Sequence, residues 1–377
     1  MELNPQRDEL RDTGGVARQT SDAVDRDRVA FTELPVVDLR RWQGAAADRE
    51  AFAAEVADIC HRVGFFVVVE HSIDGSFIDS IFEMMHDLFG LPDAEKSAID
   101  KRRSRHFRGW EAVGTEFTNN RPDIREQVDL WSERPARGPD VQPAYLRLLG
   151  PNQWFRDDVL PGSAALMRRW FTEMGALADA LLGVLSVGLE LDEKYLATMF
   201  GDEPMSLTKL IRYPPTPPGG AGVNAHHDTG FLTLLAPGPT PGLQIENQAG
   251  EWIPAPSIPG GLIVNLGEML QSLTGNYFTA TPHRVITDDV RYSAAYFHGP
   301  SLDTSLTPLP LGDRFHQAVA ASAHHAGAGF MATKAETDAG VGDMQSEHHA
   351  AVYGEQLWNY FARSYPELVT AHYPGDT

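Results

Sequence analysis

The sequence predicts a mixed α+β fold, with a double-stranded β-helix (jelly-roll) core braced by N-terminal helices and a C-terminal helix. Residues 48–64 repeat apolar side chains such as Val56 and Ile59 every three to four positions, which is typical of an amphipathic helix. From about residue 205, short β-rich runs alternate with Pro and Gly turns, which indicates a sandwich or barrel. The chain has 377 residues, 42% of them hydrophobic, and can bury a sizeable core.

The front half of the chain is predicted to supply the helices and a few strands. Residues 1–33 are polar and lack apolar periodicity, so we expect a mobile tail. Residues 100–160 are rich in Pro, Arg and Asn and are predicted to be irregular. The elements expected in this half are strands at 34–39 and 64–71 and helices at 48–64, 74–92 and 163–191.

Residues 205–310 are predicted to form the jelly roll, and residues 34–204 the mixed helical region before it. Residues 311–377 are expected to hold an insertion or lid loop at 318–348, rich in Ala and Gly, and a closing helix at 348–369. The strands of the jelly roll are predicted within 206–215, 231–238, 242–247, 261–267, 283–288 and 291–300.

Composition narrows the class of partner. The formal net charge of −21 at pH 7 argues against nucleic-acid binding. The basic run at 100–110 is expected to be a solvated helix end or loop. Cys60 is the single cysteine, so no intramolecular disulfide forms, and the N-terminal residues lack a signal segment. No apolar run reaches the ~18 residues of a membrane span, so we expect a cytoplasmic protein without a membrane partner.

Two histidines and an aspartate lie side by side in the run "NAHHDTG". Side chains alternate along a strand, so His226 and Asp228 are predicted to share a face while His227 points away. His283, in another predicted strand, supplies a third ligand. Two imidazoles and one carboxylate leave open positions on a metal, an arrangement that suits non-haem Fe(II). An HxD pair also occurs by chance, so these side chains could equally be ordinary polar residues.

A second pair of residues strengthens the metal hypothesis. Arg291 and Ser293 follow His283 and lie two apart on a predicted strand, so their side chains share a face. The guanidinium fork matches a carboxylate, and a hydroxyl completes the pair. This is the pair of groups that a dicarboxylate needs when its keto-acid end chelates iron. The alternative for Arg291 is an exposed strand arginine, but "SAAYF" continues a buried strand.

These motifs resemble the isopenicillin N synthase-like family of 2-oxoglutarate/Fe(II) dioxygenases. The resemblance covers about 34–310 and 350–370, with Glu70 and Ser72 departing from the common Asn and Gly. The motifs that carry it are "LPVVDL", "VADICHRVGFFVVVEHSI", "LIRYPP", "AHHDTGFLTLL", "GLQI", "GLIVNLGEMLQSLTGNYFTATPHRV" and "RYSAAYFHGP", in family order.

Within the family, residues 108–126 look nearest to the bacterial ethylene-forming enzyme. That resemblance implies that Glu116 and Thr118 contact the substrate, and "ARSYP" implies the same for Arg363. Thr229 departs, because a tyrosine follows the aspartate there, and Ser293 departs as well. These departures put the ethylene-forming reaction in doubt and leave the dioxygenase chemistry in place.

The family resemblance also implies two further site residues. Tyr213 would lie beside the cosubstrate, and Phe297 would line the substrate pocket on the face of Arg291 and Ser293. The alternative for Tyr213 and Phe297 is plain core packing, and for Glu116 an ordinary polar loop.

The resemblance implies an enzyme that uses Fe(II), 2-oxoglutarate and O₂ and most simply hydroxylates a small molecule, releasing succinate and CO₂. Because Glu116 can pair a cation and Arg363 a carboxylate, an amino acid or a derivative is favoured. Three alternatives stay open: a 2-oxoglutarate-independent oxidase or cyclase of the same fold, an ethylene-forming type of reaction, and a non-enzymatic metal-stapled binding protein. We expect a monomer or weak homo-oligomer.

Overall fold

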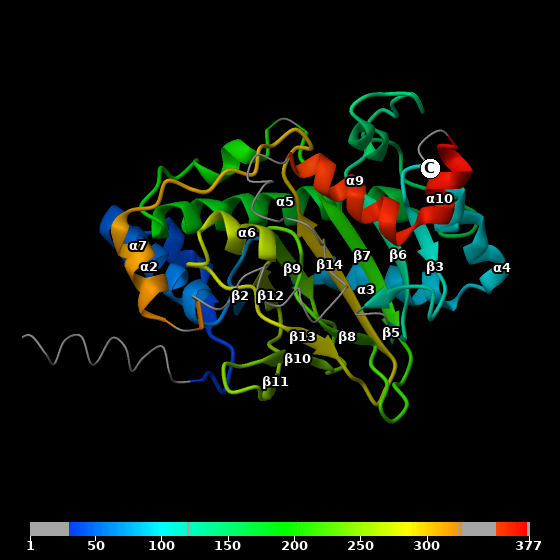
Figure 1. The fold of residues 1–377 in the computed structure, drawn as a ribbon. Helices are drawn as coiled ribbons and strands as arrows, with labels where there is room; N and C mark the ends of the chain where they lie inside the picture. The colour runs from blue at the N-terminus through cyan, green and yellow to red at the C-terminus, as the bar shows by residue number, and fades with distance from the viewer. Residues whose placement is uncertain (1–29, 119–120, 202, 323, 326–351, 375–377) are drawn as a thin grey trace, which may run out of the picture.

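Two β-sheets form the centre of the molecule, as the sequence predicts (Figure 1). One has eight strands and the other four. In Figure 1 the smaller sheet lies on the side of the larger one away from the long helix α5 (Ser163–Gly188). The predicted tail, apart from its last residues, and most of the predicted 318–348 loop lie outside the described part. The computed structural model describes residues 30–118, 121–201, 203–322, 324–325 and 352–374.

The larger sheet has the order β1-β2-β12-β9-β14-β7-β6-β3. It therefore takes strands from both sides of residue 205. β1 and β2 run parallel, and the other neighbours are antiparallel. Its strands are β1 (Val36–Asp38), β2 (Phe65–Val69), β3 (Gly109–Glu111), β6 (Glu126–Trp131), β7 (Leu207–Tyr213), β9 (Leu232–Ala236), β12 (Leu262–Leu266) and β14 (Arg291–His298).

The smaller sheet has the order β11-β10-β13-β8 and is antiparallel throughout. A short hairpin of β4 (Phe117–Thr118) and β5 (Arg121–Pro122) lies against β8. The strands of the smaller sheet are β8 (Val223–His226), β10 (Leu243–Glu246), β11 (Trp252–Pro254) and β13 (His283–Val285).

Helices cover the outer face of the larger sheet. α3 and α5 pack on β14, and α2 packs on α5. Of the described helices, α5 alone is long and apolar enough to cross a membrane by length and composition, but 56% of its apolar window is buried in the protein. That burial is typical of a core helix. The helices are α2 (Ala46–Arg62), α3 (Gly75–Gly90), α4 (Asp93–Lys96), α5 (Ser163–Gly188), α6 (Glu268–Leu273), α7 (Asp313–Ala321), α9 (Tyr353–Ser364) and α10 (Pro366–His372), with 3-10 turns η1 (Leu39–Gln43), η2 (Ser97–Ile99), η3 (Lys101–Arg103), η4 (Ala144–Leu148) and η5 (Leu196–Met199).

The region predicted to be irregular, 100–160, contains a buried strand of the larger sheet. All six residues of β6 are buried, although the run "EQVDLW" is half polar. The basic run at 100–110 is also less exposed than predicted, because Lys101 and Arg108 are both fully buried. Arg108 donates to backbone carbonyls, among them that of Leu148 at 3.0 Å. Both predictions are wrong for the same reason. Buried hydrogen-bond partners permit the burial of polar side chains that the sequence pattern assigns to the surface.

The predicted closing helix is broken in two at Tyr365. α9 ends at Ser364 and α10 begins at Pro366, whose ring suits the first helical position because no backbone N–H is needed there. The aromatic ring of Phe361 on α9 packs against Phe107 and Trp131, with ring centroids 4.8 and 5.6 Å away. The C-terminal helix therefore closes over one end of β6.

Candidate functional site

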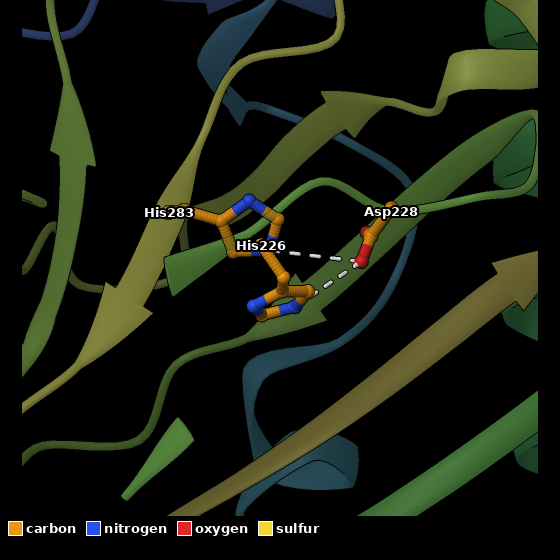
Figure 2. Close-up of side chains that lie close together, drawn as sticks. All are labelled: His226, Asp228 and His283. Atoms are coloured by element: carbon orange, nitrogen blue, oxygen red, sulfur yellow. Dashed lines mark ion pairs between the residues drawn. The ribbon is translucent and has the colours of Figure 1, made fainter. Parts of the chain in front are cut away.

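His226 and His283 are brought together by strand register. β8 and β13 are antiparallel neighbours, and these two residues lie directly opposite each other. Their ring centroids are 4.3 Å apart. Figure 2 shows both rings turned toward the carboxylate of Asp228. The Nε2 atoms of His226 and His283 lie 3.7 and 3.6 Å from Asp228 Oδ1.

Asp228 reaches this site from a turn. β8 ends at His226, so Asp228 does not lie on the strand as predicted, although its carboxylate still meets His226 on the predicted side. The turn is fixed by α6, because the backbone N–H of Glu268 donates to the Asp228 carbonyl at 2.8 Å. Gly267 permits this approach, since a Cβ there would lie 2.2 Å from the carbonyl oxygen of Gly230.

Hydrogen bonds on the far side of each group orient the three ligand atoms. His226 Nδ1 lies 2.8 Å from the Asn224 carbonyl, and His283 Nδ1 lies 3.1 Å from the Thr281 carbonyl. A carbonyl only accepts, so Nδ1 carries the proton and Nε2 presents its lone pair to the site. Asp228 Oδ2 accepts from the hydroxyl of Thr233 at 2.6 Å and from the side-chain amide of Asn265 at 2.7 Å, so Oδ1 is the oxygen that faces the histidines.

The electrostatics keep these groups in the protonation state that binds a cation. Burial, together with the neighbouring His283, lowers the pKa of His226 to about 3. Burial alone would raise the pKa of Asp228, but His283, His226 and the amide of Asn265 outweigh it and hold that pKa below its usual value. Near neutral pH the site therefore offers a neutral imidazole beside a carboxylate, which is the form that binds a divalent metal.

His227 belongs to another environment. The ligand atoms of His226, Asp228 and His283 all lie within 4.8 Å of one another, and among the described residues they form the one such group able to hold a metal ion. His227 Nδ1 instead lies 3.8 Å from Glu268 Oε1. Burial, helped by His283, lowers the pKa of His227 to about 4.

Arg291 and Ser293 form a buried polar pair on β14. Their exposed fractions are 1% and 0%. Arg291 Nε and Nη1 and Ser293 Oγ are buried without a hydrogen-bond partner among the described residues. Tyr213 lies opposite Arg291 in β7, and the guanidinium stands 5.1 Å from the centre of its ring. Burial lowers the pKa of Arg291, with Tyr213 partly opposing it. Buried, unsatisfied donors on a cation require an anionic ligand, so the pair fits a carboxylate.

Glu116 and Thr118 lie in a hydrogen-bonded hairpin beside β8. Glu116 Oε2 pairs with Arg125 at 2.5 Å and Oε1 with Lys209 at 3.0 Å, so both of its oxygens are occupied. The hydroxyl of Thr118 donates to Asp123 Oδ2 at 2.7 Å. The pKa of Glu116 lies below its usual value, because Arg125 and Lys209 outweigh the effect of burial.

Asp123 connects this hairpin to the strand of His226. The fully buried Asp123 accepts from the backbone N–H of Asn224 at 3.2 Å and from its side-chain amide at 3.0 Å. Asp123 Oδ2 also pairs with Arg125 at 3.2 Å. Since the Asn224 carbonyl accepts from His226, the hairpin and the metal candidate share one network.

The other three predicted substrate residues lie on separate segments of the fold. Thr229 is half-buried in the turn after Asp228. Phe297 is half-buried in β14, opposite Leu207 of β7. Arg363 is exposed on α9. Their roles stay predictions.

Sequence reasoning missed several polar residues of the site. Asn265 interrupts the apolar run "LIVNLG", and Lys209 interrupts "LTKLIRY". Asp129 and Gln127 are polar positions within β6. A polar residue inside an otherwise buried strand is the signal that could have found them.

Two family models match the chain. One is described as the 2OG-Fe(II) oxygenase superfamily and matches residues 202–300. The other is described as the N-terminal region of a non-haem dioxygenase in morphine synthesis and matches residues 34–157. The first match contains all three residues of the metal candidate as well as Arg291 and Ser293.

Curated relatives and solved structures agree with the family models. A 2-oxoglutarate-dependent dioxygenase from Gibberella zeae is 31% identical, over 68% of this chain and 68% of the relative. A homoarginine-6-hydroxylase from Arabidopsis thaliana is 30% identical, over 75% of this chain and 82% of the relative. A full-length Neurospora crassa protein, solved in complex with alpha-KG, has a TM-score of 0.64 at 24% identity, covering 74% of this chain and 88% of that one. At that identity the likeness shows the fold alone.

Proposed function

The chain belongs to the 2OG-Fe(II) oxygenase superfamily and is a 2-oxoglutarate/Fe(II)-dependent dioxygenase, and from that premise we propose which of its residues do the work. His226, Asp228 and His283 bind the iron. Arg291 and Ser293 bind the distal carboxylate of 2-oxoglutarate, with Tyr213 beside it.

The donor set supports the metal assignment. Two imidazole nitrogens and one carboxylate oxygen converge from β8, β13 and the turn after β8. Two nitrogens and one oxygen on one face leave positions for a chelating cosubstrate and for O₂, which is the ligand set of non-haem Fe(II) oxygenases. The backbone carbonyls on Nδ1 fix both rings and raise the basicity of Nε2.

The observation that carries the proposal is the unsatisfied pair on β14. Arg291 is fully buried, and two of its nitrogen atoms have no partner in the described part of the chain; the buried hydroxyl of Ser293, two residues away, has none there either. Such a buried cation is costly unless an anion completes it. A dicarboxylate supplies that anion at one end and a metal-chelating keto acid at the other. When bound, iron and 2-oxoglutarate supply oxidising power: O₂ is consumed, 2-oxoglutarate becomes succinate and CO₂, and one oxygen atom enters a C–H bond of the substrate.

We propose hydroxylation of an amino acid or a derivative as the reaction. The support is the Arabidopsis relative, which is named a homoarginine-6-hydroxylase, and the charged residues beside the metal candidate. Glu116, Thr118, Thr229, Phe297 and Arg363 are the residues proposed to surround the substrate. The protein's contribution is to hold the reacting carbon near the metal and keep water from it.

One experiment tests the assignment and separates the alternatives. Purified protein with Fe(II), O₂ and 2-oxoglutarate is assayed for succinate in the presence of single amino acids. We expect succinate to form one-for-one with hydroxylated product, and Arg291→Gln to suppress it. Product without succinate would favour an oxidase, ethylene would favour the ethylene-forming reaction, and no consumption of 2-oxoglutarate with any candidate would contradict the proposal.

A further inference from the structure

The inner face of β6 continues the face that carries Ser293. Across the neighbouring strands β6, β7 and β14, Gln127 lies opposite Ile211, which lies opposite Ser293. One rung along, Asp129 lies opposite Lys209. Directly opposite residues of a sheet point to the same side. Gln127 and Asp129 therefore face the side of the sheet that bears the proposed cosubstrate pair, about 10 Å from Ser293 by strand spacing.

Both side chains keep one acceptor without a partner. Their exposed fractions are 1% for Gln127 and 2% for Asp129. Asp129 Oδ2 accepts from Lys101 at 2.8 Å and from Lys209 at 3.3 Å, whereas Oδ1 has no partner among the described residues. The Gln127 amide donates to Glu111 at 3.0 Å, and Gln127 Oε1 has none. Two buried acceptors without donors are costly unless a ligand supplies N–H or O–H groups.

The charges around these acceptors are unbalanced. Seven buried or half-buried charged side chains, joined by ion pairs, form what we term the inner charge cluster. It contains four carboxylates and three cations, so without a bound ligand its net charge is −1. A ligand that brings one positive charge would neutralise the cluster, and one that brings a negative charge would worsen it. Its members are Glu111, Glu116, Asp123 and Asp129, with Lys101, Arg125 and Lys209.

We propose that Asp129 and Gln127 bind the cationic end of the substrate, a guanidinium or ammonium group. The inference rests on the proposed function, since it deepens the substrate assignment of the same site. A guanidinium supplies several N–H donors and one positive charge, which are the two properties that the inner charge cluster lacks. Glu116 is less suited to this role, because both of its oxygens already pair with Lys209 and Arg125.

The experiment compares cationic compounds with neutral ones of the same shape. Calorimetry is done anaerobically on the full chain with Fe(II) and 2-oxoglutarate bound. The probes are L-homoarginine against L-homocitrulline, and L-lysine against L-norleucine. We expect the cationic member of at least one pair to bind about tenfold or more tightly than its neutral counterpart, the difference that one hydrogen bond to a charged group makes.

Two variants test the residues, and a third is the control. Asp129→Asn and Gln127→Met should each weaken binding of the cationic probe by about tenfold and leave binding of the neutral probe unchanged. Gln127→Met leaves all seven charged residues in place, so it decides the question if Asp129→Asn fails to fold. Glu126→Gln is the control, because Glu126 is also a buried acid of β6 with two basic partners, Lys96 and Arg212, but lies on the opposite face. Glu126→Gln should leave the preference for the cationic probe over the neutral one unchanged.

Failure of the inference is distinguishable from failure of the proposed function. The affinity of the wild-type protein for 2-oxoglutarate is measured first. If the wild type does not bind 2-oxoglutarate, the cosubstrate assignment is contradicted. With 2-oxoglutarate bound, equal affinity for both members of each pair, or no binding of any cationic probe, would overturn the inference alone. Unchanged cation affinity in folded Gln127→Met and Asp129→Asn would overturn it as well.

Discussion

His226 and His283 lie directly opposite each other across the antiparallel pair of β8 and β13, and both turn Nε2 toward the same oxygen of Asp228. The metal candidate thus depends on sheet register, with the third ligand supplied by a turn that α6 holds in place. Changes that preserve the sheet but remove one ligand atom should therefore weaken metal binding strongly without unfolding the protein.

The neighbouring histidines provide a matched pair for this prediction. His226→Ala should reduce Fe(II) affinity at least about 100-fold, because one of three ligands is lost. His227→Ala, one residue along the chain, should leave the affinity within about twofold, because that ring faces Glu268. Anaerobic metal titration of both variants checks this. Equal losses in the two variants would show that the wrong histidine has been assigned.

Asn265 and Thr233 hold the carboxylate that carries the third ligand atom. Asn265→Leu removes the amide that donates to Asp228 Oδ2, so the carboxylate can rotate. We expect the Fe(II) affinity to fall by about 10- to 100-fold while the thermal unfolding midpoint changes little. Thr233→Val tests the second bond in the same way. Unchanged metal affinity in both variants would mean that these bonds do not orient Asp228.

Arg291 should show opposite effects on cosubstrate binding and on stability. Arg291→Gln removes a charge-assisted contact, so the dissociation constant of 2-oxoglutarate should rise by about 10- to 100-fold. The same change relieves a buried, incompletely paired charge, so the free energy of unfolding without 2-oxoglutarate should stay equal or increase. Urea unfolding with and without 2-oxoglutarate measures both effects. Stabilisation by 2-oxoglutarate that persists in the variant would contradict the assignment.

The basic run "KRR" offers a stability test with an internal control. Lys101 is buried and bonds to Glu111, Asp129 and the hydroxyl of Tyr365. Lys101→Met leaves two buried carboxylates short of a partner and should lower the free energy of unfolding by about 3–5 kcal/mol. Arg102→Met, at a side chain that is 77% exposed, should change it by less than about 0.5 kcal/mol. Similar small losses in both variants would show that the buried pairs contribute little.

The sequence predicts the type of each main element because hydrophobic period is a local property. The helix of Val56 and Ile59 and the buried strand "FFVVV" follow from it directly. Hydrophobic period does not predict that β6 is a fully buried strand, because Gln127 and Asp129 alternate with apolar residues and yet are buried among charges instead of facing water. Its neighbour in the sheet, β7, lies far along the chain, and no local pattern predicts that pairing.

The candidate site shows the same division between local and distant information. His227 lies apart from the cluster, as predicted, but strand alternation is not the reason, because β8 ends at His226 and both His227 and Asp228 come from the irregular segment after it. The partner of Lys101 at Tyr365 is 264 residues away. Spacing therefore identifies candidate ligands, whereas the polar groups that orient and neutralise them emerge only from the folded chain.

The most direct test of the central assignment is a crystal structure of the protein grown anaerobically with Fe(II) and 2-oxoglutarate. We predict a metal ion bound by Nε2 of His226, Nε2 of His283 and Oδ1 of Asp228. The dicarboxylate should chelate that ion and place its far carboxylate on Arg291 and Ser293. A metal bound by other residues, or 2-oxoglutarate bound away from Arg291, would contradict the account.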